Sequence, residues 1–126
     1  MKAWQIHELG DPWDVLRLGE VEPPEPGPAM VRVTVEAADL NFADILQCQG
    51  SYQVKVPTPF TPGMSCGGTI NAIGDGVDLV VGTRVLGMAA PGSGGFGEQS
   101  LLAAADVTLV PDGVETATAV AMHVTY

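Results

Sequence analysis

The stretch PFTPGMSCGG, residues 59–68, has the composition of a loop whose backbone path is tightly restricted. Each proline restricts its own φ angle, and each glycine can adopt a positive φ or let another chain approach closely. The apolar run TINAI at 69–73 follows directly, and the turn GDG at 74–76 ends it. We therefore predict that residues 59–68 form a structured loop, not a core element, and lead into a strand at 69–73.

Glycines and prolines divide the remaining chain into short segments, which is typical of a mainly β domain with few helices. We predict strands at 2–8, 15–21, 30–37, 69–73, 84–88, 99–103 and 107–110. The clearest is MVRVTVEA at 30–37, because apolar and polar residues alternate along it. The sequence also predicts a turn at Gly10-Asp11-Pro12 and an extended connector at the proline-dense residues 22–28.

Two segments have the pattern of a helix. In residues 41–49 the apolar positions have helical spacing: Phe42, Ile45 and Leu46. Gly50 follows as a stop signal, and Asn41 with Asp44 three residues later forms a capping pattern at the start. The alanine-rich residues 115–126 are predicted to form a C-terminal helix.

The chain has 126 residues, which corresponds to one domain, and a net charge of −10. Its five basic residues are scattered, which argues against binding to nucleic acid or to an anionic membrane. No apolar stretch approaches the ~20 residues that span a bilayer, and the first residues show no signal-peptide pattern. We therefore expect a cytoplasmic protein in which Cys48 and Cys66 are reduced thiols.

Two short motifs suggest chemistry that their surroundings do not support. Residues 92–97 match G-x-G-x-x-G, but at most about eight helical residues could follow them, too few for a dinucleotide site. We interpret them as a turn before a strand.

Residues 63–67 match G-x-S-x-G, with Asp106 or Asp112 and then His123 in hydrolase order. Prolines before Ser65 and glycines after it are incompatible with the strand and helix of a nucleophile elbow.

A metal site is also not indicated by the spacing of possible ligands. His7, Cys48, Cys66 and His123 are isolated from one another in the sequence. Structural zinc sites usually have ligands in closely spaced pairs, and no such pair is present. We therefore expect no bound metal.

Six motifs occur in an order that we associate with one family. They are Asn41–Leu46, Gly50–Tyr52, Pro59–Gly63, Gly74–Val77, Val81–Val85 and Gly94–Glu98. Together they resemble the N-terminal, GroES-like domain of the quinone oxidoreductases, the zinc-independent branch of the medium-chain dehydrogenase/reductase superfamily. The resemblance covers nearly the whole chain. It implies a partly open β-barrel with a short helix near 41–49 and a C-terminal helix.

The resemblance also identifies positions where zinc-dependent relatives bind their catalytic metal. By register these positions hold Asn41, Met64 with Ser65, and Val124. None of these side chains replaces a thiolate or an imidazole in a tetrahedral zinc site. The resemblance therefore implies metal-independent chemistry.

The implied function is the substrate-side, catalytic domain of an NADPH-dependent quinone or enone oxidoreductase. In that family the cofactor carries out the hydride transfer and the protein positions the reactants. The resemblance places Asn41 near the nicotinamide and ribose, and Tyr52 on the substrate side as a donor to a quinone oxygen. Thr125 would lie beneath the nicotinamide as a second cofactor contact.

The family's second domain, a Rossmann fold, would begin after residue 126. We expect the present chain, domain 1–126, to be inactive without it, because that domain binds most of the NADPH. The full-length protein is expected to be a homodimer whose partner molecules are small quinones or enones. Two alternatives remain open: a stand-alone, non-enzymatic binding or assembly module with this fold, and an alcohol dehydrogenase-like reductase of another substrate class.

Overall fold

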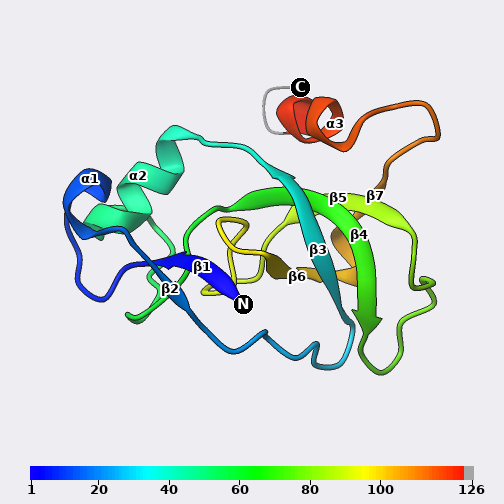
Figure 1. Cartoon of the computed structure of the whole chain (residues 1–126), viewed down its shortest axis with the longest axis horizontal. Helices are drawn as coiled ribbons and strands as arrows, with labels where there is room; N and C mark the ends of the chain where they lie inside the picture. The colour runs from blue at the N-terminus through cyan, green and yellow to red at the C-terminus, as the bar shows by residue number, and fades with distance from the viewer. Residues whose placement is uncertain (124–126) are drawn as a thin grey trace.

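The computed structural model describes residues 1–123 as two antiparallel sheets and short helices (Figure 1). The strands are β1 (Lys2–Gln5), β2 (Arg17–Glu20), β3 (Met30–Ala38), β4 (Ser65–Ile73), β5 (Arg84–Met88), β6 (Gln99–Ala103) and β7 (Thr108–Leu109). The helices are α1 (Pro12–Val15), α2 (Phe42–Gln49) and α3 (Thr116–His123), with a single 3₁₀ turn at Ala104–Asp106. None of these described helices is long and apolar enough to cross a membrane.

Five strands form the larger sheet in the order β6-β3-β4-β5-β7, and β1 and β2 form a separate hairpin. The segment before β6 joins the two sheets, because the Trp4 N–H donates to the Phe96 carbonyl at 2.8 Å and the Glu98 N–H donates to the Lys2 carbonyl at 3.0 Å. The described strands therefore curve into an incomplete barrel whose outer strands are β2 and β7. The predicted mainly β architecture is confirmed.

The main difference from the sequence prediction lies in residues 65–68. They are the first part of β4 and are fully buried, so the expectation that they belong to a loop was wrong. β4 is a central strand that pairs with β3 on one side and β5 on the other. A Cβ atom on Gly68 would lie 1.9 Å from the Thr34 carbonyl oxygen, so only glycine fits there. Tertiary packing thus selects a strand where local composition favours a loop.

The N-terminal hairpin also differs in detail from the prediction. The predicted strands at 2–8 and 15–21 are shorter, and the predicted turn at residues 10–12 leads into the unpredicted helix α1. Pro12 occupies the first turn of α1, where its missing N–H leaves no hydrogen bond unmade. The extended connector at 22–28 is confirmed, since no helix or strand forms there.

Helix α2 forms as the sequence predicts. Asn41 is its N-cap, and Gly50 ends it in the left-handed conformation with φ of 77°. The Gly50 N–H donates to the Gln47 carbonyl at 3.1 Å, which satisfies one of the free carbonyls at the helix end. The other predicted helix is described as α3 up to His123, and residues 124–126 lie outside the described part of the chain.

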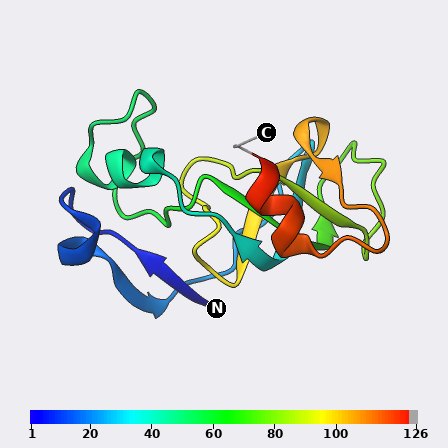
Figure 2. The same ribbon diagram turned by 90° about the horizontal axis from the view of Figure 1, so that it is seen from above.

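Helix α3 covers the outer face of the larger sheet (Figure 2). Its buried residue Val120 packs with Leu86 and Val110 in an apolar cluster between the helix and the sheet. A Cβ atom on Gly67 would lie 2.7 Å from a methyl carbon of Val120, so glycine at this position lets the helix lie close to β4.

A polar network holds the first turn of α3 against β3 and β5. The Thr116 hydroxyl donates to the Glu36 carboxylate at 2.6 Å, and the Thr69 hydroxyl donates to its other oxygen at 2.7 Å. The Arg84 guanidinium donates to the Val114 carbonyl at 2.8 Å and to the Thr116 hydroxyl at 3.1 Å. These bonds connect segments that are far apart in the sequence and fix where the helix begins.

The two cysteines lie in different parts of the core. Cys66 packs with Val31 and Ile70 inside the larger sheet, and Cys48 packs with Ile6 and Phe60 beneath the N-terminal hairpin. Both are free, buried thiols and do not pair. Burial raises the pKa of Cys66 to about 11 and also raises that of Cys48, so neither thiol is activated as a nucleophile.

The close packing at Gly68 predicts the effect of a single added methyl group. We expect Gly68→Ala to lower the free energy of unfolding by about 3 kcal/mol or more, because the new Cβ would displace the main chain of β3. Gly19→Ala in β2 is the matched control, since a Cβ there meets nothing within 4 Å. Urea unfolding measures both variants. Equal stability of the two variants would contradict the packing described here.

The network at Glu36 predicts a loss of stability in acid. Hydrogen bonds from Thr116 and then Thr69 lower the pKa of Glu36 below its usual value of 4.5, so the folded chain takes up this proton less readily than the unfolded chain. The stabilisation that the ionised Glu36 carboxylate gives the folded chain is therefore complete above pH 4.5. It disappears as the pH falls through the lowered pKa. Thermal unfolding should be measured from pH 7 to pH 3. The unfolding temperature should fall less over this range in Glu36→Gln and Thr116→Val than in the wild type. If the unfolding temperatures of the wild type and the variants fell equally with pH, this role of Glu36 would be contradicted.

Candidate functional site

A buried carboxylate joins the two segments in which the sequence analysis placed candidate residues. The Asn41 N–H donates to Asp44 Oδ2 at 2.8 Å, and the Met64 N–H donates to Asp44 Oδ1 at 2.9 Å. The bond from the Asn41 N–H to the Asp44 carboxylate confirms the predicted capping pattern at the start of α2, and the Asp44 N–H also donates to the Asn41 main-chain carbonyl at 3.0 Å. Through Asp44, the start of α2 is held against the residue that precedes β4.

The environment of Asp44 makes it a positioning residue. The residue is 2% exposed, and both carboxylate oxygens accept main-chain N–H groups. Burial is the largest influence on its pKa and raises it, the two N–H groups oppose this, and the negative charge of Asp39 adds to the increase. A carboxylate with both oxygens occupied in this way fixes the backbone and is not placed to accept a substrate proton.

The structure brings some of the predicted positions together. Asn41 and Met64 are linked through Asp44, and Ser65 directly follows Met64 as the first residue of β4. Tyr52 lies half-buried in the loop that follows α2. Thr125, the other predicted cofactor contact, is outside the described residues.

The side chains at this site are an amide, a thioether and a hydroxyl. Within residues 1–123, no three His, Cys, Asp or Glu side chains are close enough together to hold a metal ion. Val124, the fourth position of the zinc register, lies outside the described residues. Asn41 can donate and accept hydrogen bonds and Met64 can pack against a flat ring, whereas the Ser65 hydroxyl is buried within β4.

The glycine-rich residues 92–97 form a turn, as interpreted from the sequence. The Gly94, Gly95 and Phe96 N–H groups donate to the carbonyls of residues 61, 63 and 62 at 3.0, 2.8 and 3.1 Å. A phosphate-binding loop needs free N–H groups at a helix start, and these three groups are used to bind the PFTPG segment instead. Residues 92–97 and the PFTPG segment at 59–63 are therefore held together by main-chain hydrogen bonds.

The G-x-S-x-G match does not form a nucleophile elbow. Ser65 is the first residue of β4, is 1% exposed, and is followed by eight more strand residues in place of a helix. Its carbonyl accepts the Asp39 N–H at 3.3 Å, which extends the pairing of β3 with β4. A serine buried in a central strand cannot attack a substrate, in agreement with the sequence interpretation.

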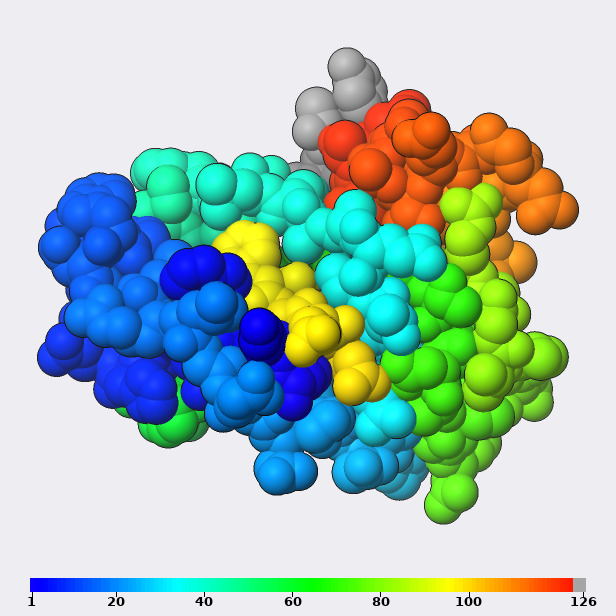
Figure 3. Space-filling view, viewed as in Figure 1, coloured from blue at the N-terminus to red at the C-terminus, as the bar shows by residue number. Residues whose placement is uncertain are grey.

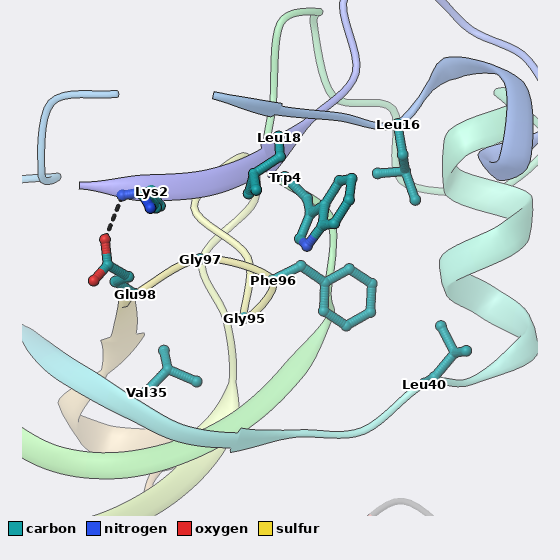
Figure 4. Close-up of a pocket in the computed structure, with 10 residues that line it drawn as sticks. All are labelled: Lys2, Trp4, Leu16, Leu18, Val35, Leu40, Gly95, Phe96, Gly97 and Glu98. Carbon is teal, nitrogen blue, oxygen red and sulfur yellow. Dashed lines mark hydrogen bonds between the residues drawn. The ribbon is translucent and has the colours of Figure 1, made fainter. Parts of the chain in front are cut away.

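One hollow of the described chain is not indicated by the sequence. It is an open groove of about 640 Å³ between the hairpin, the end of β3 and the segment before β6 (Figure 4). Its lining is mainly apolar and includes Trp4, Leu16, Leu18, Leu40 and Phe96. The only sequence signal was the apolar character of Trp4 and Leu18 in short strands, because β1 and β2 must pair before these side chains share a surface.

The Asp44 contacts predict a large effect of its removal. We expect Asp44→Ala to lower the free energy of unfolding by about 2–5 kcal/mol, because two buried N–H groups would each lose their acceptor. The matched control is Asp14→Ala, which removes an exposed aspartate from the first turn of α1 and should change stability by less than about 0.5 kcal/mol. Chemical denaturation with both variants measures this difference. A small effect of Asp44→Ala would show that the bridge is not formed.

Comparison with known proteins agrees with this fold. Residues 27–112 match the family model of the alcohol dehydrogenase GroES-like domain. The chain is 39% identical over 112 residues to the quinone oxidoreductase-like protein 2 of Bos taurus, covering 88% of this chain and 32% of that protein. It is 40% identical over 105 residues to the synaptic vesicle membrane protein VAT-1 homolog of Rattus norvegicus, covering 82% of this chain and 26% of that protein.

Solved structures have the same fold over nearly the whole chain. A probable oxidoreductase from Mycobacterium abscessus superposes with a TM-score of 0.88 at 34% identity, covering 100% of this chain and 39% of that one. A mycobacterial quinone oxidoreductase superposes with a TM-score of 0.86 at 32% identity, covering 95% of this chain and 36% of that one. The chain thus spans about a third of the length of these relatives. It belongs to the alcohol dehydrogenase GroES-like domain family, and its homologues are quinone oxidoreductase-like and VAT-1 proteins of the medium-chain dehydrogenase/reductase superfamily.

Proposed function

We propose that this chain is the substrate-side domain of an NADPH-dependent quinone or enone oxidoreductase that transfers hydride without a metal. The observation that carries the proposal is the Asp44 bridge, which places Asn41 beside Met64. These are two of the positions that hold metal ligands in the zinc-dependent branch of the family. Here they carry an amide and a thioether, which suit hydrogen bonding and packing against an organic cofactor.

The identity of the relatives supports this reaction class. A quinone oxidoreductase-like protein is 39% identical in sequence, and a solved mycobacterial quinone oxidoreductase is 32% identical. A mycobacterial structure that is 32% identical, with a TM-score of 0.82, was solved in complex with NADPH. We extend this cofactor to the present protein, with most of the binding assigned to a nucleotide-binding domain in a longer chain.

In this proposal the described residues hold and orient the reactants. Bound NADPH would supply a hydride, and a quinone that gains this hydride and a proton becomes a hydroquinone. The Asn41 amide would contact the nicotinamide or its ribose from the start of α2. Thr125, which lies outside the described residues, is proposed as a second contact to the nicotinamide. Tyr52, in the loop after α2, would donate a hydrogen bond to the substrate oxygen. Asp44 would act indirectly, by keeping Asn41 in place.

A test of the reaction class needs the protein in its longer form. NADPH consumption should be measured with a quinone and with an enone, using residues 1–126 joined to the coding sequence that follows. We expect turnover of at least one of these substrates without added metal. Inactivity toward both, together with activity toward an alcohol when zinc is supplied, would overturn the proposal in favour of an alcohol dehydrogenase-like enzyme.

A pair of substitutions at Asn41 separates its capping role from its proposed role in the reaction. Asn41→Ser keeps a good N-cap residue but removes the amide, whereas Asn41→Ala removes both. We expect both variants to lose about tenfold or more in kcat/KM for NADPH oxidation, a loss that corresponds to one hydrogen bond in the transition state. Only Asn41→Ala should also lose about 1 kcal/mol of stability. Wild-type activity in Asn41→Ser would show that Asn41 has only a structural role.

A further inference from the structure

Two buried polar atoms beside the candidate site have no hydrogen-bond partner within the described residues. They are Oδ1 of Asp39, two residues before Asn41, and the hydroxyl oxygen of Ser65, one residue after Met64. A buried polar atom without a partner costs free energy, so native proteins rarely keep one that has neither a function nor a ligand. Both groups are therefore candidates for an effect on a bound molecule.

Strand pairing places the two side chains on the same face of the larger sheet. Ala38 of β3 pairs with Cys66 of β4. The Asp39 N–H then donates to the Ser65 carbonyl at 3.3 Å, which continues this register by one residue. Directly opposed residues of antiparallel strands point to the same side. Because Cys66 packs in the apolar core and side chains alternate along a strand, Asp39 and Ser65 point to the other face.

That other face is the one covered by α3. Gly67 shares the face of Ser65, because it is two residues further along β4. A Cβ on Gly67 would lie 2.7 Å from a methyl carbon of Val120 in α3. The segment that joins β3 to α2 and contains Asp39 lies between α2 and α3 (Figure 2, Figure 3). Asp39 therefore lies on the α3 side of the sheet, directly before the end of α2 at which Asn41 is the N-cap.

The Asp39 carboxylate has no ion-pair partner in the described part of the chain. Among residues 1–123, the carboxylates that form ion pairs are those of Glu20 and Glu25. Burial is the main reason that the pKa values of Asp44 and Cys66 are raised, and the negative charge of Asp39 adds to both increases. Charges interact more strongly across protein than across water. The candidate site therefore has a negative potential to which Asp39 contributes.

We propose that the charge of Asp39 stabilises the oxidised form of the bound cofactor and so promotes hydride transfer, an inference that rests on the proposed function. Hydride transfer from bound NADPH moves a hydrogen with both bonding electrons to the substrate and leaves one positive charge on the nicotinamide ring. A quinone then takes a proton from water to become a hydroquinone. A fixed carboxylate stabilises the positive charge as it develops, and it has little effect on the neutral ring of the reduced cofactor.

Asp44 is less suited to this role than Asp39. Main-chain N–H groups occupy both oxygens of Asp44, and their partial positive charges offset its negative charge. Oδ1 of Asp39 has no such donor within the described residues. The two carboxylates therefore differ in function: Asp44 fixes the backbone, and Asp39 supplies charge.

Binding of the two nucleotides tests this charge effect without the reaction. Asp39→Asn keeps the size of the side chain and removes its charge. NADP⁺ and NADPH carry the same phosphates and differ by one positive charge at the ring, so the ratio of their dissociation constants isolates the effect at the ring. In the longer protein, calorimetry should show that Asp39→Asn raises the Kd of NADP⁺ relative to that of NADPH by about tenfold. The kcat for NADPH oxidation should also fall about tenfold, with little change in the KM for NADPH.

Two further variants serve as controls. Asp78→Asn changes the net charge equally, but Asp78 is exposed in the connection that leaves the far end of β4. Its ratio of dissociation constants should remain that of the wild type. Asp39→Glu keeps the charge and should keep the ratio within about threefold of the wild-type value. Urea unfolding should show that Asp39→Asn is at least as stable as the wild type, because one of two neighbouring negative charges is removed.

Each remaining outcome separates this inference from the proposed function. An unchanged ratio in Asp39→Asn, or a marked loss of its stability, would overturn the role of Asp39, and turnover by the wild type would then leave the proposed function intact. A shifted ratio in a protein that reduces neither a quinone nor an enone would support Asp39 and contradict the reaction. A wild type that binds neither nucleotide would overturn both.

Discussion

The fold depends on the close approach of three elements at Gly67 and Gly68. A Cβ on Gly68 would lie 1.9 Å from the Thr34 carbonyl oxygen, and one on Gly67 would lie 2.7 Å from a Val120 methyl carbon. The absence of two side chains thus lets β4 lie between β3 and β5 while α3 packs directly on top. Because Met64 immediately precedes β4, a displacement of this strand would also displace the candidate site.

Two sets of charged hydrogen bonds then fix the helices at the ends of this arrangement. Asp44 binds the start of α2 to Met64, and Glu36 with Arg84 binds the start of α3 to the sheet. The two carboxylates show opposite pKa shifts for different reasons: burial raises the pKa of Asp44, while hydroxyl donors lower that of Glu36. Both act on backbone position, and so the side chains that would meet a cofactor are presented by rigid elements.

The described domain therefore combines a well-supported interior with an open exterior on one side. The candidate site consists of segments held by buried hydrogen bonds, whereas the hairpin leaves the apolar groove and the β2 edge uncovered. The chain spans about a third of the length of these relatives.

The sequence by itself determined the mainly β architecture, helix α2 with its Asn41 cap, and the strands at 84–88 and 99–103, because each depends on local periodicity, capping or turn residues. It also indicated the family, since six motifs occur in order. It did not reveal that residues 65–68 form a buried strand, that Asp44 reaches Met64, or that Trp4 and Phe96 share a groove. Each of these involves residues 20 or more positions apart, whose contact depends on how the strands pair, and only the tertiary structure decides that pairing.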